Sequence, residues 1–139
     1  MVIIQTPLRI SFFGGGTDYP VHFREHGGAV LATSIDKYLY TSCRHLGPFH
    51  AHKHRITYSK IEDVVDVGQI LHPAVREIFK YMNVEQGMEV HADADIPARS
   101  GMGSSSSFTV GLLHALYALR GEMIDKNRLA KEAMHVEQN

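Results

Sequence analysis

The stretch that decides the fold is residues 96–107, which read IPARSGMGSSSS. Its two glycines permit unusual backbone dihedrals and let the chain approach a ligand closely. The serines run directly into residues 104–120, whose apolar side chains predict a helix that is buried nearly all round. Because a helix start offers unpaired N–H groups and the positive end of the helix dipole, this loop predicts a site for an anion such as phosphate.

This loop differs from the two commonest nucleotide-binding loops. A Walker A loop needs a lysine before its Ser/Thr, whereas Gly103 is followed directly by Ser104. A dinucleotide-binding loop needs a third glycine, where Ser106 stands here. The plainer alternative is a flexible turn whose serine caps the helix. Four consecutive serines and two spaced glycines exceed what a cap requires, so the phosphate site is favoured.

The composition narrows the class of protein. The 139 residues are 44% hydrophobic and 21% charged, which excludes a mainly disordered chain and suits one domain. The formal charge of -1 argues against a nucleic-acid partner, which would need a basic face. No apolar run is long enough for a membrane span. The single cysteine, Cys43, excludes an internal disulfide and favours a reducing, cytoplasmic location.

Hydrophobic patterning predicts early strands and late helices, which is typical of an α+β fold. The expected strands are residues 2–5 and 8–13 with Pro7 between them, a hairpin over 29–46 turning at Asp36-Lys37, and strands at 53–59 and 87–94. The expected helices are residues 21–26, 72–82 and 104–120, and a last one that begins near Asp125.

Two motifs carry a resemblance to a known family. The loop, read as Pro97-x-x-x-Gly101-x-Gly103-Ser104-Ser105, resembles the phosphate-binding motif of the GHMP kinase superfamily (galactokinase, homoserine kinase, mevalonate kinase and phosphomevalonate kinase). Residues 7–19, PLRISFFGGGTDY, are similar to its first motif, in which an arginine stands nine residues before an aspartate, as Arg9 and Asp18 do. Gly15-Gly16 replaces the Glu-His pair of galactokinases. The glycine-rich variant and the four serines look most like the branch of D-glycero-D-manno-heptose 7-phosphate kinases.

The resemblance implies a fold and an activity. Residues 1–139 would form the N-terminal ATP-binding domain of such a kinase, similar to the second domain of ribosomal protein S5, without the C-terminal domain. The implied activity is ATP-dependent phosphorylation of a sugar or sugar phosphate, foremost at the anomeric hydroxyl of heptose 7-phosphate. Two alternatives stay open: another family member, of fucose or mevalonate type, and a non-catalytic nucleotide-binding module.

The resemblance also implies roles for particular residues. The triphosphate of ATP would be held by Ser100, Gly101, Gly103, Ser104, Ser105 and Ser106, and Mg²⁺ by Ser105 and Glu137. Arg9 would lie near the transferred phosphoryl group, and the sugar would meet Asp18 and Tyr19, with Arg99 able to pair with a ligand phosphate. Plainer interpretations exist, since Asp18 suits a turn, Arg9 a surface position with a buried stem, and Glu137 a solvated helix face.

Two further expectations concern the end of the chain. Many members carry a proposed catalytic-base aspartate about a dozen residues after the position of Glu137, and no residue here matches it. We therefore expect the 139-residue chain alone to lack useful kinase activity. The apolar face of the last helix, at Leu129, Ala133 and Val136, predicts exposed apolar surface and self-association through that helix.

Ten histidines are an unusual number, and His45, His50, His52 and His54 crowd one segment. In a strand, residues 50, 52 and 54 would share one face and could bind Zn²⁺, although no carboxylate lies within the cluster and an exposed hairpin tip is the favoured interpretation. His114 is expected in the core, and Cys43 is expected to be buried as a small apolar residue. The remaining single histidines, His22, His26 and His91, are expected at the surface.

Overall fold

A computed structural model describes residues 1–97 and 100–138 of the chain. Its sheet has five strands in the order β1-β2-β5-β3-β4. Neighbouring strands are antiparallel except β3 and β5, which are parallel. The strands are β1 (Val2–Phe13), β2 (Leu31–His45), β3 (His54–Thr57), β4 (Ile61–Val64) and β5 (Met88–Ala94).

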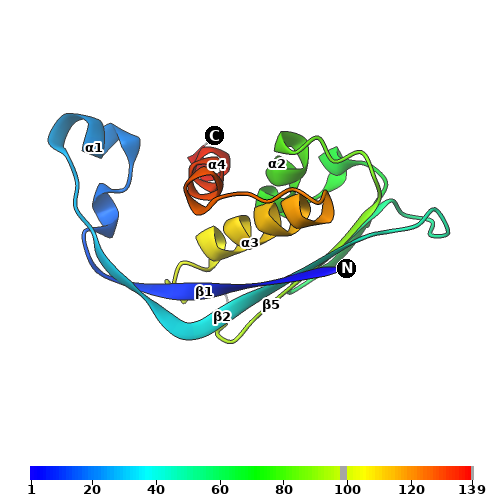
Figure 1. The fold of residues 1–139 in the computed structure, drawn as a ribbon, viewed down its shortest axis with the longest axis horizontal. Coiled ribbons are helices and arrows are strands. Elements are labelled where there is room, and N and C mark those ends of the chain that lie inside the picture. The colour runs from blue at the N-terminus through cyan, green and yellow to red at the C-terminus, as the bar shows by residue number, and fades with distance from the viewer. Residues whose placement is uncertain (98–99, 139) are drawn as a thin grey trace.

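Helices cover one face of this sheet. In Figure 1, α3 lies directly on the sheet, with α2 and α4 beside and above it, and the opposite face of the sheet carries no helix among the described residues. The helices are α1 (Pro20–His26), α2 (Pro73–Tyr81), α3 (Ser104–Leu119) and α4 (Lys126–Gln138), with 3-10 turns η1 (Gly15–Thr17) and η2 (Val67–Gln69). This mixed sheet with a helical layer confirms the α+β prediction.

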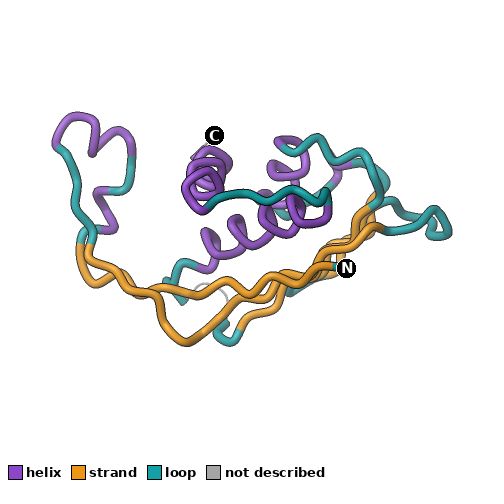
Figure 2. Tube along the Cα trace, in the orientation of Figure 1, coloured by secondary structure: helices purple, strands orange, loops and turns teal. Residues whose placement is uncertain are grey.

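The arm made by η1 and α1 stands apart from this layer. β1 and β2 continue beyond the helices and carry the arm at their far end, as the tube in Figure 2 shows. No residue of α1 is buried, and His22 and His26 are exposed as expected.

α3 forms the centre of the core, as the sequence predicts. Leu112, Leu113 and Ala115 are fully buried. The helix lies very close to the sheet at Gly111, where a Cβ atom would stand 2.9 Å from the Thr6 hydroxyl oxygen. The prediction for His114 is wrong, because His114 lies on the one side of α3 that is exposed.

α2 and α4 begin where the sequence predicts. Pro73 is at the start of α2, and the His72 ring nitrogen Nδ1 accepts a hydrogen bond from the Val75 N–H at 3.4 Å. The Asp125 carboxylate caps α4 by accepting from the N–H groups of residues 127 and 128, at 2.9 Å each. Leu129 and Ala133 are buried within the chain, 8% and 5% exposed. Two of the three residues of the predicted apolar face of α4 are therefore covered within the chain, and self-association through this helix stays a prediction.

The strands depart most from the sequence prediction. No hairpin turns at Asp36-Lys37, because β2 runs unbroken through these residues and pairs with β1 on both sides of them, at Ser34 and at Tyr38. β1 likewise continues through Pro7, with a register shift before Arg9. Pro7 is tolerated because β1 is an edge strand of the sheet. The strands expected at 53–59 and 87–94 are present as β3 and β5, whereas β4 was not predicted.

The histidine cluster does not form one face of a strand. β3 begins only at His54, so His50 and His52 lie in the preceding loop. His54 is fully buried, whereas His45 and His50 are exposed. Among residues 1–97 and 100–138, no three or more His, Cys, Asp or Glu side chains are placed to hold a metal ion. His91 is exposed, as predicted.

Cys43 is buried, as the sequence predicts. The residue is 1% exposed, and burial raises the pKa of its thiol to about 12. Within the described part of the chain, the helices are too short or too polar to cross a bilayer.

Candidate functional site

The glycine-serine loop joins β5 to α3. Gly101 and Gly103 have φ angles of 76° and 71°, in the left-handed region that favours glycine. α3 then begins at Ser104, so its unpaired N–H groups open onto the loop. Ser105 is exposed and Ser104 and Ser106 are half-buried, which leaves their hydroxyl groups available to a ligand.

Two hydrogen bonds fasten the loop to the first strand. The Arg9 N–H donates to the Met102 carbonyl at 3.1 Å. The buried Ser107 hydroxyl donates to the Pro7 carbonyl at 2.9 Å. Ser107 therefore has a structural partner, in contrast to the exposed Ser105.

The Arg9 side chain lies over the loop. A Cβ atom at Gly103 would stand 2.9 Å from Arg9 Cγ and 3.1 Å from Arg9 Nε. Because glycine has no Cβ, the arginine can lie directly against the backbone. The structure thus places a positive side chain beside the positive end of α3, which suits an anionic ligand.

The side chain of Glu137, on α4, contacts the first turns of α3. Its Oε2 accepts a hydrogen bond from the Ser106 hydroxyl at 3.1 Å, and its Oε1 accepts from the Thr109 hydroxyl at 3.2 Å. The sequence paired Glu137 with Ser105, whereas the contact seen is with Ser106, one residue further along. One carboxylate with neighbouring hydroxyls fits Mg²⁺, which takes oxygen ligands from the protein and completes its shell with phosphate and water.

A cavity of about 850 Å³ adjoins the loop. Its lining includes Arg9, Gly101, Gly103, Ser104 and Ser105. It also includes the aromatic residues Tyr58, His72 and Phe108. The lining therefore offers groups that suit an anion and groups that suit a flat apolar molecule.

Two of the ring residues have shifted pKa values. The hydrogen bond from Tyr58 to Glu62 raises the pKa of the phenol to about 12. Burial lowers the pKa of His72, which keeps its imidazole neutral at pH 7. Both rings therefore present uncharged faces to the cavity.

The sequence did not indicate a role at this site for the rings of Tyr58, His72 and Phe108, or for Glu62. They come from three separate places, around β3 and β4, at the start of α2 and within α3. Each taken alone has the pattern of an ordinary core or turn residue. The sequence shows that positions 58 and 108 are aromatic, but it does not show that they lie near each other in the fold.

The predicted sugar residues lie elsewhere. Asp18 and Tyr19 are exposed in the arm, outside the lining of the cavity. Figure 1 shows this arm apart from the helical layer that carries the loop. Arg99 lies outside the described residues.

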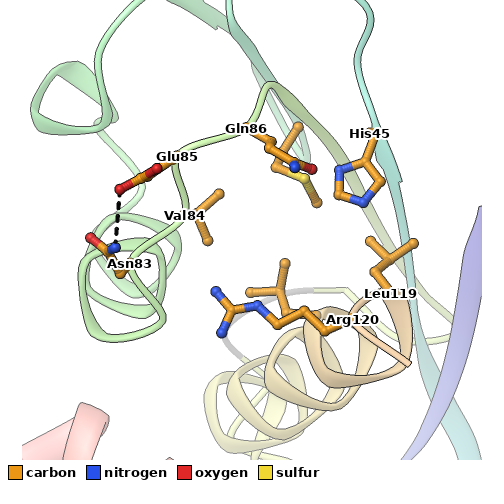
Figure 3. A pocket seen from close by; sticks show the side chains of 9 residues that line it. His45, Asn83, Val84, Glu85, Gln86, Leu119 and Arg120 are labelled. Atoms are coloured by element: carbon orange, nitrogen blue, oxygen red, sulfur yellow. Dashed lines mark hydrogen bonds between the residues drawn. The ribbon is translucent and has the colours of Figure 1, made fainter. Parts of the chain in front are cut away.

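A second cavity, of about 460 Å³, lies at the other end of α3. Figure 3 shows the Arg120 guanidinium on the side of Val84, and Leu119 next to His45. The Asn83 side chain there donates to Glu85 at 3.3 Å, and the Arg120 guanidinium donates to the Met82 carbonyl. None of the site residues expected from the sequence lines it, so the loop cavity is the candidate functional site.

Comparison with known proteins shows the family of the chain. A family model described as the GHMP kinases N terminal domain matches residues 69–139. A D-glycero-alpha-D-manno-heptose 7-phosphate kinase of Campylobacter jejuni is 27% identical over 142 residues, which cover 96% of this chain. The chain spans 42% of the length of that relative.

Solved structures share the fold. A D-glycero-D-manno-heptose 1-phosphate kinase from Bacteriodes thetaiotaomicron superposes with a TM-score of 0.79 at 20% identity, covering 100% of this chain and 48% of that one. The mevalonate kinase of Methanococcus jannaschii has a TM-score of 0.73 at 20% identity, with 99% and 46% covered. A Streptococcus pneumoniae phosphomevalonate kinase, solved with phosphomevalonate and AMPPNP, has a TM-score of 0.72 at 19% identity, with 98% and 42% covered.

Proposed function

Since the chain belongs to the GHMP kinase family, whose N-terminal domain it carries, we propose that it binds ATP in the loop cavity and serves phosphoryl transfer to a sugar phosphate. The observation that carries the proposal is the junction of the glycine-serine loop, the start of α3 and the Arg9 side chain in the lining of a cavity of about 850 Å³. The triphosphate lies at this junction, on the N–H groups of the helix.

The base of the nucleotide lies against the aromatic residues of the same cavity. The volume is within the roughly 300–1,000 Å³ of small-molecule sites. The rings of Tyr58, His72 and Phe108 offer surfaces on which a purine can stack, and such contacts are worth about 0.5–1.5 kcal/mol each.

The chemistry asked of this chain is positioning and charge stabilisation. The γ-phosphoryl group carries its negative charge on equatorial oxygens in the transition state, so fixed donors lower the barrier. The N–H groups at the start of α3 and the Arg9 guanidinium supply such donors. Ser105 or Ser106 and Glu137 would help to hold Mg²⁺, which would supply positive charge to the phosphates of the nucleotide.

The sugar phosphate is D-glycero-D-manno-heptose 7-phosphate, in keeping with the name of the Campylobacter relative. Asp18 and Tyr19 contact the sugar hydroxyls, and Arg99 pairs with the ligand phosphate. Substitution Asp18→Asn then raises KM for the sugar and leaves the affinity for ATP unchanged. A mevalonate-type acceptor remains the second candidate, favoured by the fold shared with mevalonate kinases.

Nucleotide binding is the first test. Calorimetric titration with ATP and Mg²⁺ should give one site, and Ser105→Ala should weaken it about tenfold, the worth of one hydrogen bond to a charged group. Ser42→Ala, a half-buried serine of β2, is the matched control and should bind like the wild type. Unchanged affinity in the Ser105 variant would refute the loop assignment.

Phosphoryl transfer is the second test. Label from γ-labelled ATP is followed into a panel of heptose, fucose and mevalonate acceptors. The 139-residue chain assayed by itself is expected to bind ATP but to show no useful turnover, because no residue in it matches the proposed base. A longer protein that contains this chain should phosphorylate heptose 7-phosphate. ATP binding without transfer to any acceptor in that longer protein would favour the non-catalytic module.

A further inference from the structure

Glu62, in β4, is a buried carboxylate that lies behind the candidate site. It is 7% exposed. Carboxylates are rarely buried unless their oxygens are paired, because the transfer from water is costly. Glu62 does not line the cavity, so any effect it has on a ligand acts through its neighbours.

Three donors satisfy this carboxylate. The Tyr58 hydroxyl donates to Oε1 at 2.7 Å, and the His72 N–H donates to the same oxygen at 3.1 Å. The Leu71 N–H donates to Oε2 at 2.6 Å. Glu62 thus ties the β3–β4 hairpin to the residues that begin α2.

Two of these donors belong to Tyr58 and His72. The rings of these two residues and of Phe108, which all line the cavity, form its ring wall. The Tyr58 and His72 rings meet edge to face, with centroids 4.8 Å apart and planes at 88°. The His72 ring then contacts Phe108 of α3, with centroids 4.9 Å apart. The rings therefore form a row across three elements, and Glu62 binds the side chain of the first member and the backbone N–H of the second.

We propose that Glu62 is a positioning residue for nucleotide recognition, which fixes Tyr58 and His72 so that the base can stack on them. The proposal rests on the proposed function, because it takes the ring wall as the place of the base. A stacking surface built from side chains of separate elements loses affinity when the rings can move, since binding must then order them.

Substitution Glu62→Gln isolates this role. The amide has nearly the same volume, but only one of its two terminal atoms accepts hydrogen bonds. Either Leu71 or the Tyr58–His72 pair then faces an NH₂ group. The matched control is Glu77→Gln on α2, where a half-exposed glutamate pairs with Arg76 and Lys80 on the surface.

The experiment compares two probes, ATP and inorganic tripolyphosphate, by calorimetric titration with Mg²⁺ present. The two share the anionic end and only ATP has a base. Glu62→Gln should weaken ATP binding about tenfold, the worth of one lost charged hydrogen bond, and leave tripolyphosphate within twofold of the wild type. Glu77→Gln should change neither.

Other outcomes overturn the proposal. An equal loss for both probes would mean that Glu62 only supports the fold, and an unchanged ATP affinity would mean that it does not act on the base. A wild-type protein that binds tripolyphosphate but gains nothing from the base of ATP would contradict the base site itself. If it binds neither probe, the proposed function fails.

Tyr58→Phe gives a second route if Glu62→Gln does not fold. It keeps the ring and removes one donor to Glu62. ATP binding should weaken by about threefold, with tripolyphosphate unchanged. In NMR spectra of the wild type, ATP but not tripolyphosphate should move the His72 ring signals, and this shift should shrink in the variant. Equal shifts with both probes would count against the proposal.

Discussion

Gly103 carries two requirements at once, a left-handed backbone and the absence of a side chain. Gly103→Ala should lose about 1–2 kcal/mol of stability from its φ of 71°. Its new Cβ would also push Arg9 from the loop, because the two would stand 2.9 Å apart. We expect ATP affinity to fall at least tenfold, measured by calorimetric titration.

Gly121 provides the matched control for that prediction. It follows α3 with a φ of 73°, and no atom lies within 4 Å of a Cβ built there. Gly121→Ala should therefore lose a similar amount of stability and keep its ATP affinity. If both variants lost affinity equally, backbone strain alone would explain the effect and the contact with Arg9 would be irrelevant.

His54 makes the stability of the fold depend on pH. Burial, and secondarily the charge of Lys53, lowers its pKa below 6.5, and neither of its ring nitrogens has a hydrogen-bond partner. Below pH 6.5 the unfolded chain takes up a proton that the folded chain refuses, so stability falls as the pH falls. The loss should reach about 1 kcal/mol per pH unit.

Urea unfolding between pH 8 and pH 5 measures this dependence. His54→Leu removes the titrating group and should flatten the curve, although His72, whose pKa is also lowered by burial, leaves part of the slope. A variant with the full wild-type slope would show that His54 is not responsible.

At the scale of elements, the close approach of α3 to the sheet should reverse an ordinary helix preference. Alanine in a helix interior is normally about 1 kcal/mol better than glycine. At Gly111, a Cβ would stand 2.9 Å from the Thr6 hydroxyl and 3.1 Å from the Thr41 hydroxyl, which are both buried. Gly111→Ala should therefore destabilise the protein by about 1–3 kcal/mol in chemical denaturation.

More space beside position 111 should recover part of the stability that Gly111→Ala loses. Thr41→Ala added to Gly111→Ala removes one crowded hydroxyl, itself without a hydrogen-bond partner, and should recover part of the stability. If Gly111→Ala were as stable as the wild type, α3 would be free to move away from the sheet.

Elements defined by local signals were predictable from the sequence. Pro73 and Asp125 mark helix starts through contacts within a few residues, and the glycines of the loop mark a turn. β2 was not predictable, because Asp36-Lys37 has the composition of a turn. The strand continues through these residues at a register shift, and Ser34 and Tyr38 on either side of them pair with Arg9 and Pro7 of β1. Long-range pairing of this kind leaves no local trace.

The candidate site divides in the same way. The anion-binding part of the site is one continuous stretch, residues 100–106, and was recognisable in the sequence as a motif. The ring wall unites Tyr58, His72 and Phe108 only through packing of three elements, and Glu62 in a strand of four residues has the pattern of a surface residue. The folded chain, rather than any local pattern, brings these side chains together.

For the whole molecule, exposed apolar side chains occur on the arm and on the strand that leads to it, whereas Leu129 and Ala133 of α4 are buried. Phe13 is 74% exposed at the end of β1, and Val21 is 85% exposed on α1. We expect concentration-dependent self-association through this surface, because apolar side chains gathered in one exposed region favour contact. Sedimentation of the double variant Phe13→Ser, Val21→Ser should show less association than the wild type.

Met134 gives the control on the other surface. It is 52% exposed on α4, and Met134→Ser should leave the association unchanged. A weaker association in that variant would restore α4 as the contact, and a wild type that stays monomeric at all concentrations would contradict both.

The hydrogen bond from the Arg9 amide to the Met102 carbonyl makes amide exchange at Arg9 sensitive to motion of the glycine-serine loop. Amide protons exchange with solvent only when their hydrogen bonds open. The amide of Arg9 belongs to a strand, yet its acceptor belongs to the loop that we propose as the nucleotide site. Its deuterium uptake therefore times the opening of that loop, and a single backbone signal in the first strand reports on events at the start of α3.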